Sequence, residues 1–300
     1  MDGKDQRGLL VVIGGHEDKE GDCIILREVI RLAGGEKARL VVLTAASDVP
    51  EESGQDYLDA FHRLGVKDVT HVDVSTREDA SNEQAIEAIQ NASGVFFTGG
   101  DQLHVTSLIG GSPMFTLLKQ RVKEGMVLAG TSAGAAMMSN SMILGGGSEI
   151  SPSLGEVKMG SGLDFIPGTI VDTHFAQRGR FGRLLAAAAH FPHDLGLGID
   201  EDTAMVVERG RFRVLGSGAV TVIDAGAETF TNVPDLKDGD FMALFDVHVH
   251  ILPKGYEFDL IERRPIRQPL QSELEAAKKG SSDGGEGKPK QKKEPSHADR

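Results

Sequence analysis

The first 135 residues repeat one pattern, in which an apolar run of strand length is followed by a stretch with helical periodicity. The apolar runs are "LLVVIGG", "ARLVVLTAAS", "VTHVDV", "GVFFTGG" and "MVLAG". Amphipathic stretches such as "CIILREVIRLAGG" and "SGQDYLDAFHRLG" separate them. Nearly continuous Val, Ile and Leu runs are typical of parallel strands that are buried on both faces. The pattern therefore predicts an α/β fold, with a mostly parallel sheet and helices on both of its faces.

The pattern changes after about residue 200, where short β-prone runs are separated by Gly and Asp turns. These runs predict antiparallel strands that complete the same domain, so we expect a single α/β domain over residues 1–270. Residues 271–300 hold seven basic and six acidic side chains and almost no apolar ones. Burial cannot offset the ordering entropy of such a segment, which predicts a disordered, charged C-terminal tail.

Charge and apolar content exclude several classes of partner. A net charge of −13 argues against binding to nucleic acid or to an anionic membrane surface, because both require a basic face. No stretch approaches the roughly 18 apolar residues of a membrane helix, and the short apolar run near the N-terminus lacks the features of a signal peptide. We therefore expect a cytoplasmic protein. The single cysteine, Cys23, excludes an intramolecular disulfide and is expected to be a buried structural thiol.

The segment Gly130-Thr131-Ser132-Ala133-Gly134 fits the G-x-S-x-G pattern of a nucleophile elbow. It follows the strand-like run "MVLAG" and precedes the small residues "AGAAMMS", which predict a helix. Glycines at this spacing let the backbone turn sharply and expose the serine side chain. The alternative is a tight packing turn in which Ser132 only caps the helix.

A serine hydroxyl attacks a carbonyl only when a neighbouring base, normally histidine, takes its proton. His174 is the best placed of the ten histidines, because it follows the strand-like run "GTIVDT" where the chain enters a polar loop. His248 and His250 alternate in "DVHVHILP", but no third ligand with a recognisable spacing accompanies them, so no metal site is predicted.

A carboxylate is needed to orient the base, and the stretch "LGLGIDEDTAMVV" supplies Asp200, Glu201 and Asp202 at the end of a strand-like run. The residues alone do not choose among these three. Asp172 is nearer to His174 along the chain, but alternation in a strand places the two on one face without implying a hydrogen bond. Asp172 is therefore as readily a substrate contact.

A developing oxyanion requires backbone N–H groups directed at it. The stretch "FFTGGDQ" has a glycine pair after a strand, so Gly99 or Gly100 is a candidate donor beside the N–H of Ala133. On its own, this glycine pair is equally consistent with an ordinary turn from strand to helix.

Six blocks in a fixed order resemble the cyanophycinases, which belong to the S51 family of serine peptidases together with peptidase E. The blocks are "GGHEDK" (14–19), "LTAAS" (43–47), "FFTGGDQ" (96–102), "GTSAGA" (130–135), "DTHFAQRGRFGRL" (172–184) and "GIDEDTA" (198–204). The resemblance implies a fold like that of class I glutamine amidotransferases, a flavodoxin-like three-layer sandwich. The order Ser, His, Glu also differs from the Ser, Asp, His order of α/β-hydrolases, which argues against a lipase or esterase.

By motif position, the resemblance implies that Ser132 is the nucleophile, His174 the general base and Glu201 the residue that orients it. Gly100 and Ala133 would then form the oxyanion hole. The implied reaction is the release of β-aspartyl-arginine dipeptides from cyanophycin, a poly-aspartate with arginine on its side-chain carboxyls, through an acyl-enzyme. The resemblance further implies that the reaction needs no metal or organic cofactor, and that the enzyme is a homodimer.

The same resemblance assigns a substrate pocket. Arginine forks suit bidentate capture of carboxylates, and Arg178, Arg180 and Arg183 match pocket positions of the family. Gln102 and Asp172 match other pocket positions, and a carboxylate at 172 is able to pair with a substrate guanidinium.

Departures from the family pattern leave the choice of substrate open. His16 stands where a small residue is expected, Thr173 stands where glutamine is expected, and the charged tail lies outside the common pattern. One alternative function is that of an aspartyl dipeptidase resembling peptidase E, although the arginine cluster favours a larger zwitterionic substrate. The other is a non-catalytic amidotransferase-like binding module.

Overall fold

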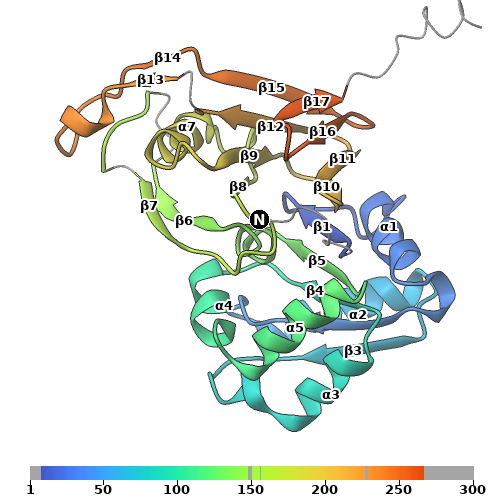
Figure 1. Cartoon of the computed structure of the whole chain (residues 1–300). Coiled ribbons are helices and arrows are strands. Elements are labelled where there is room, and N and C mark those ends of the chain that lie inside the picture. The colour runs from blue at the N-terminus through green and yellow to red at the C-terminus, as the bar shows by residue number, and fades with distance from the viewer. Residues whose placement is uncertain (1–7, 148–150, 156, 227–228, 267–300) are drawn as a thin grey trace, which may run out of the picture. The chain divides into compact units, whose positions relative to one another are not determined.

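The computed structural model describes residues 8–147, 151–155, 157–226 and 229–266 of the chain (Figure 1). All of these residues belong to one compact unit. The charged tail that we predict over residues 271–300 lies outside the described residues.

A nine-stranded sheet forms the centre of the fold, in the order β17-β16-β11-β10-β1-β5-β4-β2-β3. The five strands from β1 to β3 in this order are parallel, and β10, β11, β16 and β17 add to one side as antiparallel strands. The parallel α/β core is therefore confirmed. In sheet order the strands are β17 (Arg264–Ile266), β16 (Glu257–Asp259), β11 (Arg211–Gly216), β10 (Thr203–Glu208), β1 (Leu10–Ile13), β5 (Val127–Thr131), β4 (Gly94–Phe97), β2 (Arg39–Leu43) and β3 (Asp68–Val72).

Continuous apolar strands are explained by cores on both faces of this sheet. In β2, Leu40 and Val42 pack into the core on one face, whereas Val41 and Leu43 pack into the core on the other. Because successive side chains of a strand point to opposite faces, a strand covered on both sides needs apolar residues at every position.

Helices cover the two faces as the periodicity predicts (Figure 1). α1 and α2 pack on one face, and α3, α4 and α5 pack on the other. Side chains cap the starts of the three helices on the second face, with Asn82 at α3, Asp101 at α4 and Ser112 at α5. The helices are α1 (Ile24–Leu32), α2 (Pro50–Arg63), α3 (Glu83–Asn91), α4 (Gln102–Ile109), α5 (Pro113–Lys123), α6 (Ala133–Ala136) and α7 (Phe181–His190), with 3-10 turns η1 (Gly35–Lys37), η2 (Asp79–Ser81) and η3 (Val233–Asp235).

A second, four-stranded sheet is the feature that the sequence analysis did not foresee. Its order is β15-β12-β9-β8, so only some of the strands after residue 200 extend the central sheet. Leu197 and Val222 of this sheet join the core of the central sheet, whereas Ile170 and Ile223 pack on the other side with Leu184 of α7. The second sheet is thus itself buried on both faces. Its strands are β15 (His248–Pro253), β12 (Ala219–Asp224), β9 (Leu195–Ile199) and β8 (Thr169–Thr173).

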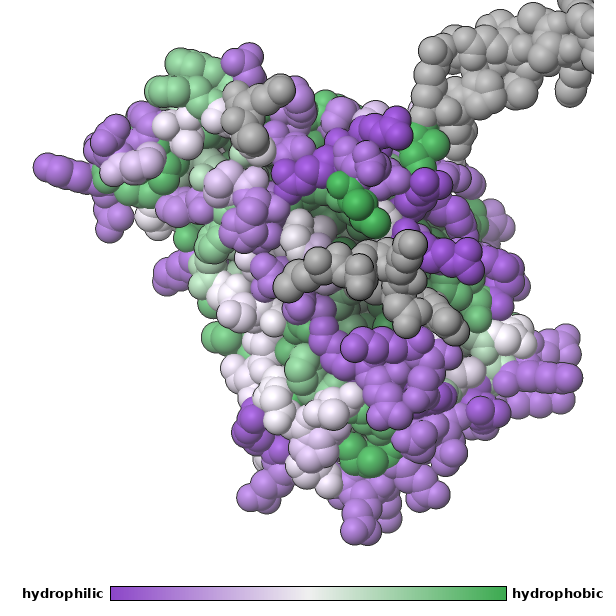
Figure 2. All heavy atoms as spheres, viewed as in Figure 1, coloured by the Kyte–Doolittle hydropathy of each residue, from purple (hydrophilic) through white to green (hydrophobic). Residues whose placement is uncertain are grey.

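Two short hairpins lie outside both sheets. β6 (Ser141–Gly146) pairs with β7 (Val157–Ser161), and β13 (Phe230–Thr231) pairs with β14 (Leu244–Phe245). The rings of Phe230 and Phe245 stack with centroids 5.0 Å apart and remain more than half exposed. Figure 2 shows a small cluster of hydrophobic side chains at this end of the molecule, beside many hydrophilic ones.

The described residues also bear on the expected buried thiol and on membrane helices. Cys23 is buried and has no disulfide partner, as predicted. Within the described part of the chain, no helix combines the length and the apolar character that crossing a bilayer requires.

Candidate active site

Ser132 occupies a strained turn between β5 and α6. Its backbone has φ 52° and ψ −110°, which non-glycine residues seldom adopt, and its N–H donates to the carbonyl of Ile13 at 3.0 Å. Flanking glycines are required by packing: a Cβ on Gly130 would lie 2.2 Å from the oxygen of Gly134, and one on Gly134 would lie 2.6 Å from the oxygen of Phe97. The turn is therefore as tight as the sequence pattern implies.

The helix that follows is shorter than expected, because α6 consists of one turn before the chain leaves toward β6. The side chain of Ser132 makes no capping hydrogen bond to this helix. The alternative in which Ser132 serves only as a helix cap does not describe this geometry.

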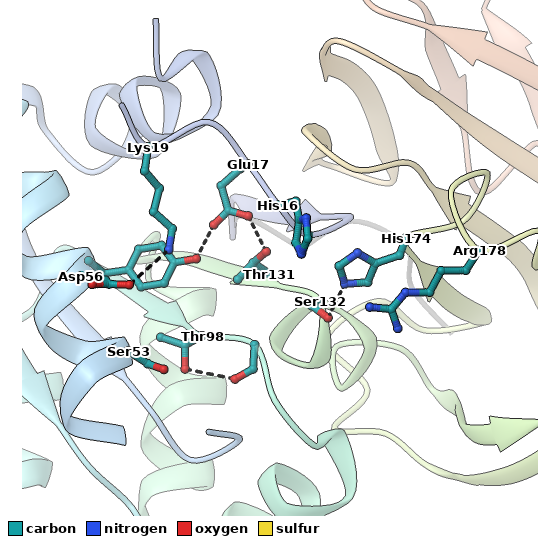
Figure 3. Close-up of a pocket in the computed structure, with 13 residues that line it drawn as sticks. His16, Glu17, Lys19, Ser53, Asp56, Thr98, Thr131, Ser132, His174 and Arg178 are labelled. Carbon is teal, nitrogen blue, oxygen red and sulfur yellow. Dashed lines mark hydrogen bonds and ion pairs between the residues drawn. The ribbon is translucent and has the colours of Figure 1, made fainter. Parts of the chain in front are cut away.

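A chain of hydrogen bonds joins Ser132, His174 and Glu201. Ser132 Oγ lies 2.9 Å from His174 Nε2, and His174 Nδ1 lies 2.7 Å from Glu201 Oε1. His174 directly follows β8 with φ 49°, and its N–H donates to the carbonyl of Gly14 at 2.8 Å. Figure 3 shows the hydroxyl of Ser132 and the ring of His174 directed at one another.

The three neighbouring carboxylates have separate partners. Asp200 accepts hydrogen bonds from the backbone N–H groups of Ala176 and Ala219, at 3.1 and 3.0 Å. Asp202 accepts one from the N–H of Asp18 at 3.0 Å. These two side chains hold loops in place, and Glu201 is the one that reaches His174.

Electrostatics favour a neutral imidazole at this position. Burial lowers the pKa of His174, since it penalises the cation, and the charges of Arg178 and His16 act in the same direction. The hydrogen bond to Glu201 opposes this shift. The pKa of Glu201 is itself lowered, chiefly by its hydrogen bond with His174, so the carboxylate is ionised and the imidazole is free to accept a proton.

Ser132 and His174 open onto a cavity of about 290 Å³ (Figure 3). Its floor is the carboxylate of Glu17, which is only 4% exposed and accepts hydrogen bonds from Tyr57 Oη at 2.5 Å and Thr131 Oγ1 at 2.6 Å. Burial, followed by the charge of Glu17, raises the pKa of Tyr57 well above its usual value. Tyr57 thus remains a neutral hydrogen-bond donor.

The far wall of the cavity carries both signs of charge. Lys19 Nζ lies 4.2 Å from the centre of the Tyr57 ring and 4.0 Å from Asp56 Oδ2. Arg178 lines the cavity on the side of His174 and is exposed to solvent. A zwitterionic ligand therefore finds partners for both its carboxylates and its cations here.

Of the two glycines considered as oxyanion donors, Gly99 lies nearer to the hydroxyl. A Cβ on Gly99 would be 4.0 Å from Ser132 Oγ, and Gly99 lines the cavity. Gly100 has φ 140°, and its position leaves no room for a side chain, because a Cβ would lie 1.7 Å from the carbonyl oxygen of Ala46. Ala133 begins α6, and the first N–H groups of a helix have no acceptor within it.

Asp172 is buried and paired with arginines of its own chain. It is 2% exposed and binds the fork of Arg183 through both oxygens, with Nε to Oδ2 at 2.7 Å. Arg180 Nη1 lies 3.3 Å from Asp172 Oδ1 and also donates to the carbonyl of Thr173. Arg183 is 8% exposed, so neither it nor Asp172 faces the cavity with free hydrogen-bonding capacity.

Gln102 also has a partner within the chain. It begins α4, and its Nε2 donates to the carbonyl of Ile143 in β6 at 2.7 Å. Of the five residues expected to bind substrate, only Arg178 lines the cavity with Ser132.

Sequence reasoning missed the floor and far wall of the cavity, which are formed by Glu17, Lys19, Asp56 and Tyr57. Glu17 and Lys19 belong to the block "GGHEDK", so a buried acid was within the matched pattern. Tyr57 and Asp56 lie on α2, where the periodicity of an amphipathic helix conceals any role beyond packing.

Comparison with known protein families shows to which family the chain belongs. The model of peptidase family S51 matches residues 9–215. This chain belongs to peptidase family S51. The resemblance drawn from the six sequence blocks is therefore confirmed, and the S51 serine peptidases are hydrolases.

Several proteins similar to this S51 chain are cyanophycinases. The chain is 42% identical over 256 residues to the cyanophycinases of Trichormus variabilis and of a Nostoc species, covering 85% of this chain and 86% of each relative. It is 39% identical over 266 residues to the cyanophycinase of Geminocystis herdmanii, covering 88% of this chain and 96% of that one.

A solved structure supports the fold of this S51 member. A peptidase from an acI-B1 actinobacterium superposes with a TM-score of 0.62 at 21% identity, covering 84% of this chain and 96% of that chain. The expected class I glutamine amidotransferase-like architecture is borne out.

Proposed function

We propose that the protein is a serine-type exopeptidase that hydrolyses cyanophycin to β-aspartyl-arginine dipeptides. The observation that carries this proposal is the hydrogen-bonded series Ser132, His174 and Glu201 at the edge of a cavity lined by both signs of charge. The similarity to curated cyanophycinases supports the choice of substrate.

In the first step, Ser132 Oγ attacks the scissile carbonyl while its proton passes to His174 Nε2, 2.9 Å away. Glu201 accepts a hydrogen bond from Nδ1–H, which keeps the proton on that nitrogen and leaves Nε2 free as the acceptor. His174 then returns the proton to the leaving amine. Water then attacks the acyl-enzyme. His174 takes the proton from this water and returns it to Ser132 Oγ as the leaving group.

The tetrahedral intermediate places negative charge on the former carbonyl oxygen. We assign its stabilisation to the N–H of Ala133 and to the backbone of the glycine pair Gly99 and Gly100. The strained turn at Ser132 supports this assignment, because it lifts the hydroxyl above the first free N–H groups of α6.

For substrate binding, Arg178 is the residue placed to meet a substrate carboxylate directly. Asp172, Arg180 and Arg183 form one buried ion cluster below β8 and the start of α7. In this proposal the cluster holds the loop that carries His174 and Arg178. A residue of the cluster would contact substrate only if an ion pair between Asp172 and one of its arginines were broken. Gln102 acts by fixing α4 to β6.

The cofactor requirement, the oligomeric state and the cellular location remain predictions. The proposed reaction uses no metal or organic cofactor, because serine, imidazole and backbone N–H groups supply the nucleophile, the base and the oxyanion site. Assembly as a homodimer and a cytoplasmic location stay predictions from the sequence.

The direct test is to incubate the purified protein with insoluble cyanophycin and to identify the products by mass spectrometry. We expect β-aspartyl-arginine from the wild type and none above background from Ser132→Ala. Ser81→Ala, which changes an exposed serine of η2, is the matched control and retains the wild-type rate. Wild-type turnover by a folded Ser132→Ala variant would refute the assignment.

The two alternative functions predict different outcomes when further substrates and a serine-directed reagent are tested. Cleavage of Asp-X dipeptides but not of cyanophycin would favour an aspartyl dipeptidase resembling peptidase E. Failure of Ser132 to react with a serine-directed phosphonate, together with no cleavage, would favour a binding module.

A further inference from the structure

His16 lies beside the proposed catalytic residues, and the proposed reaction gives it no role. It follows β1 with φ 49°, and its side chain is 71% exposed. Its Nδ1 lies 3.5 Å from Glu201 Oε2, the carboxylate oxygen that His174 does not bind. Its ring also lies edge-on to the ring of His174, with centroids 5.2 Å apart.

Backbone hydrogen bonds hold the loop that carries this imidazole. The carbonyl of Gly14 accepts from the N–H of His174 at 2.8 Å, and the carbonyl of Gly15 accepts from the N–H of Asp202 at 2.9 Å. Gly15 passes so close to His174 that a Cβ would lie 2.3 Å from its ring carbon Cε1. The loop that carries His16 is thus tied to the segments that carry the other two side chains, and little reorganisation is needed to bring all three together.

These three side chains have the chemistry of a zinc site. One nitrogen from each histidine and one oxygen from Glu201 lie within 4.8 Å of one another. Around a tetrahedral zinc ion with bonds of about 2.0–2.1 Å, neighbouring ligand atoms are about 3.3 Å apart, so small rotations of the exposed His16 and the partly exposed Glu201 toward His174 close the site. Two histidines and a glutamate, with a fourth position open to water, form a known zinc ligand set.

We propose that His16, His174 and Glu201 form an inhibitory site for zinc, and this proposal rests on the serine peptidase mechanism given above. The charge of the protein favours cation binding, since its net charge is −13. The exposed ring of His16 gives a metal ion access from solvent.

Zinc stops the reaction through the tautomer of His174. A metal ion binds a ring nitrogen that carries no proton. When zinc occupies Nδ1, the proton that this nitrogen donated to Glu201 moves to Nε2. A protonated Nε2 cannot accept the proton of Ser132, so the hydroxyl is no longer activated. No bond to the substrate is made or broken, and removal of zinc restores the original tautomer.

Metal binding is measured first, without reference to catalysis. Equilibrium dialysis against buffered zinc is expected to give one bound ion per chain for the wild type and for Ser132→Ala, which changes no ligand. His16→Asn is expected to bind at least about tenfold more weakly. Asparagine is chosen because it tolerates positive φ, and melting temperatures check that the variant is folded. His62→Asn, which changes an exposed histidine of α2, is the matched control and retains the wild-type affinity.

Inhibition is measured next, by release of dipeptide at rising zinc concentration. Zinc is expected to inhibit the wild type reversibly, with recovery on addition of EDTA, whereas Mg²⁺ and Ca²⁺, which prefer oxygen ligands, do not inhibit. His16→Asn is expected to require at least about tenfold more zinc than the wild type for half-inhibition, with each protein measured relative to its own rate without zinc.

Equal zinc affinity of the wild type and His16→Asn would overturn the proposal, as would a wild type that binds no zinc. If the protein binds zinc as expected but cleaves no peptide, the proposed function fails while the metal site stands.

Discussion

The buried ion cluster around Asp172 offers the sharpest test of whether that residue supports the fold or meets the substrate. Replacing Asp172 by Asn removes one charge and almost no volume. Asp172 is 2% exposed, and its carboxylate binds both Arg183, which is 8% exposed, and Arg180, whose side chain is 14% exposed. The substitution therefore leaves two poorly solvated guanidinium groups without their counter-ion.

The expected loss follows from the number of contacts. Each hydrogen bond to a charged group contributes about 1.5–3 kcal/mol, and breaking a buried ion pair by removing one partner costs about 3–5 kcal/mol. Because the amide oxygen of Asn still accepts one hydrogen bond and Arg180 reaches solvent, we expect the free energy of unfolding to fall by about 3 kcal/mol. At about 2–4 °C per kcal/mol, the melting temperature falls by about 6–12 °C.

Urea denaturation followed by circular dichroism measures this loss, with calorimetry for the melting temperature. Glu208→Gln, which disrupts an exposed pair in which Arg209 and Glu208 are 81% and 56% exposed, is the control and leaves the midpoint unchanged. The double variant Asp172→Asn with Arg183→Met is expected to lose less than the sum of the single variants, because their effects are coupled. A loss below about 1 kcal/mol for Asp172→Asn would refute the structural role and favour a direct substrate contact.

Two further predictions concern the elbow and the base. Gly130→Ala is expected to destabilise the protein by about 1–3 kcal/mol and to abolish cleavage, because the new Cβ would lie 2.2 Å from a backbone oxygen. Gly145→Ala is the control and is expected to behave as the wild type, since a Cβ there would have nothing within 4 Å. Urea titration measures the stability of both variants, and dipeptide release measures their activity. With EDTA present, kcat/KM is expected to fall on acidification with a midpoint below about 6.5, because burial lowers the pKa of His174 and the cation cannot act as the base. A midpoint near 7 or above would show that burial does not dominate at this residue.

The central sheet was predictable because its physical signal is local. Strands buried on both faces must be apolar at each position, and β2 and β4 are recognised for that reason. The elbow was recognisable too, because the G-x-S-x-G pattern is local and a side chain at Gly130 is excluded by Gly134, four residues away, although the contact that excludes one at Gly134 is with the distant Phe97.

The second sheet was not predictable, because nothing in a single strand states which sheet it joins. β10 and β12 have similar compositions, yet β10 pairs with β1 and β12 pairs with β9. The residues alone also left open which carboxylate orients His174. Asp200, Glu201 and Asp202 are neighbours in the sequence, and their roles are separated only by the distant N–H group or ring nitrogen that each one contacts. The partners of Asp172 likewise become visible only when β8 and α7 are packed together.

The proposed active residues lie on two different sheets, and this arrangement has a consequence for how activity would be lost. Ser132 follows β5 of the nine-stranded sheet, whereas His174 and Glu201 follow β8 and β9 of the four-stranded one. The gap between Ser132 Oγ and His174 Nε2 therefore lies between two sheets. Its width depends on the apolar side chains packed between these sheets. If the proposed mechanism holds, widening this gap by a fraction of an ångström abolishes cleavage while every strand remains paired, so activity is lost before any spectroscopic sign of unfolding.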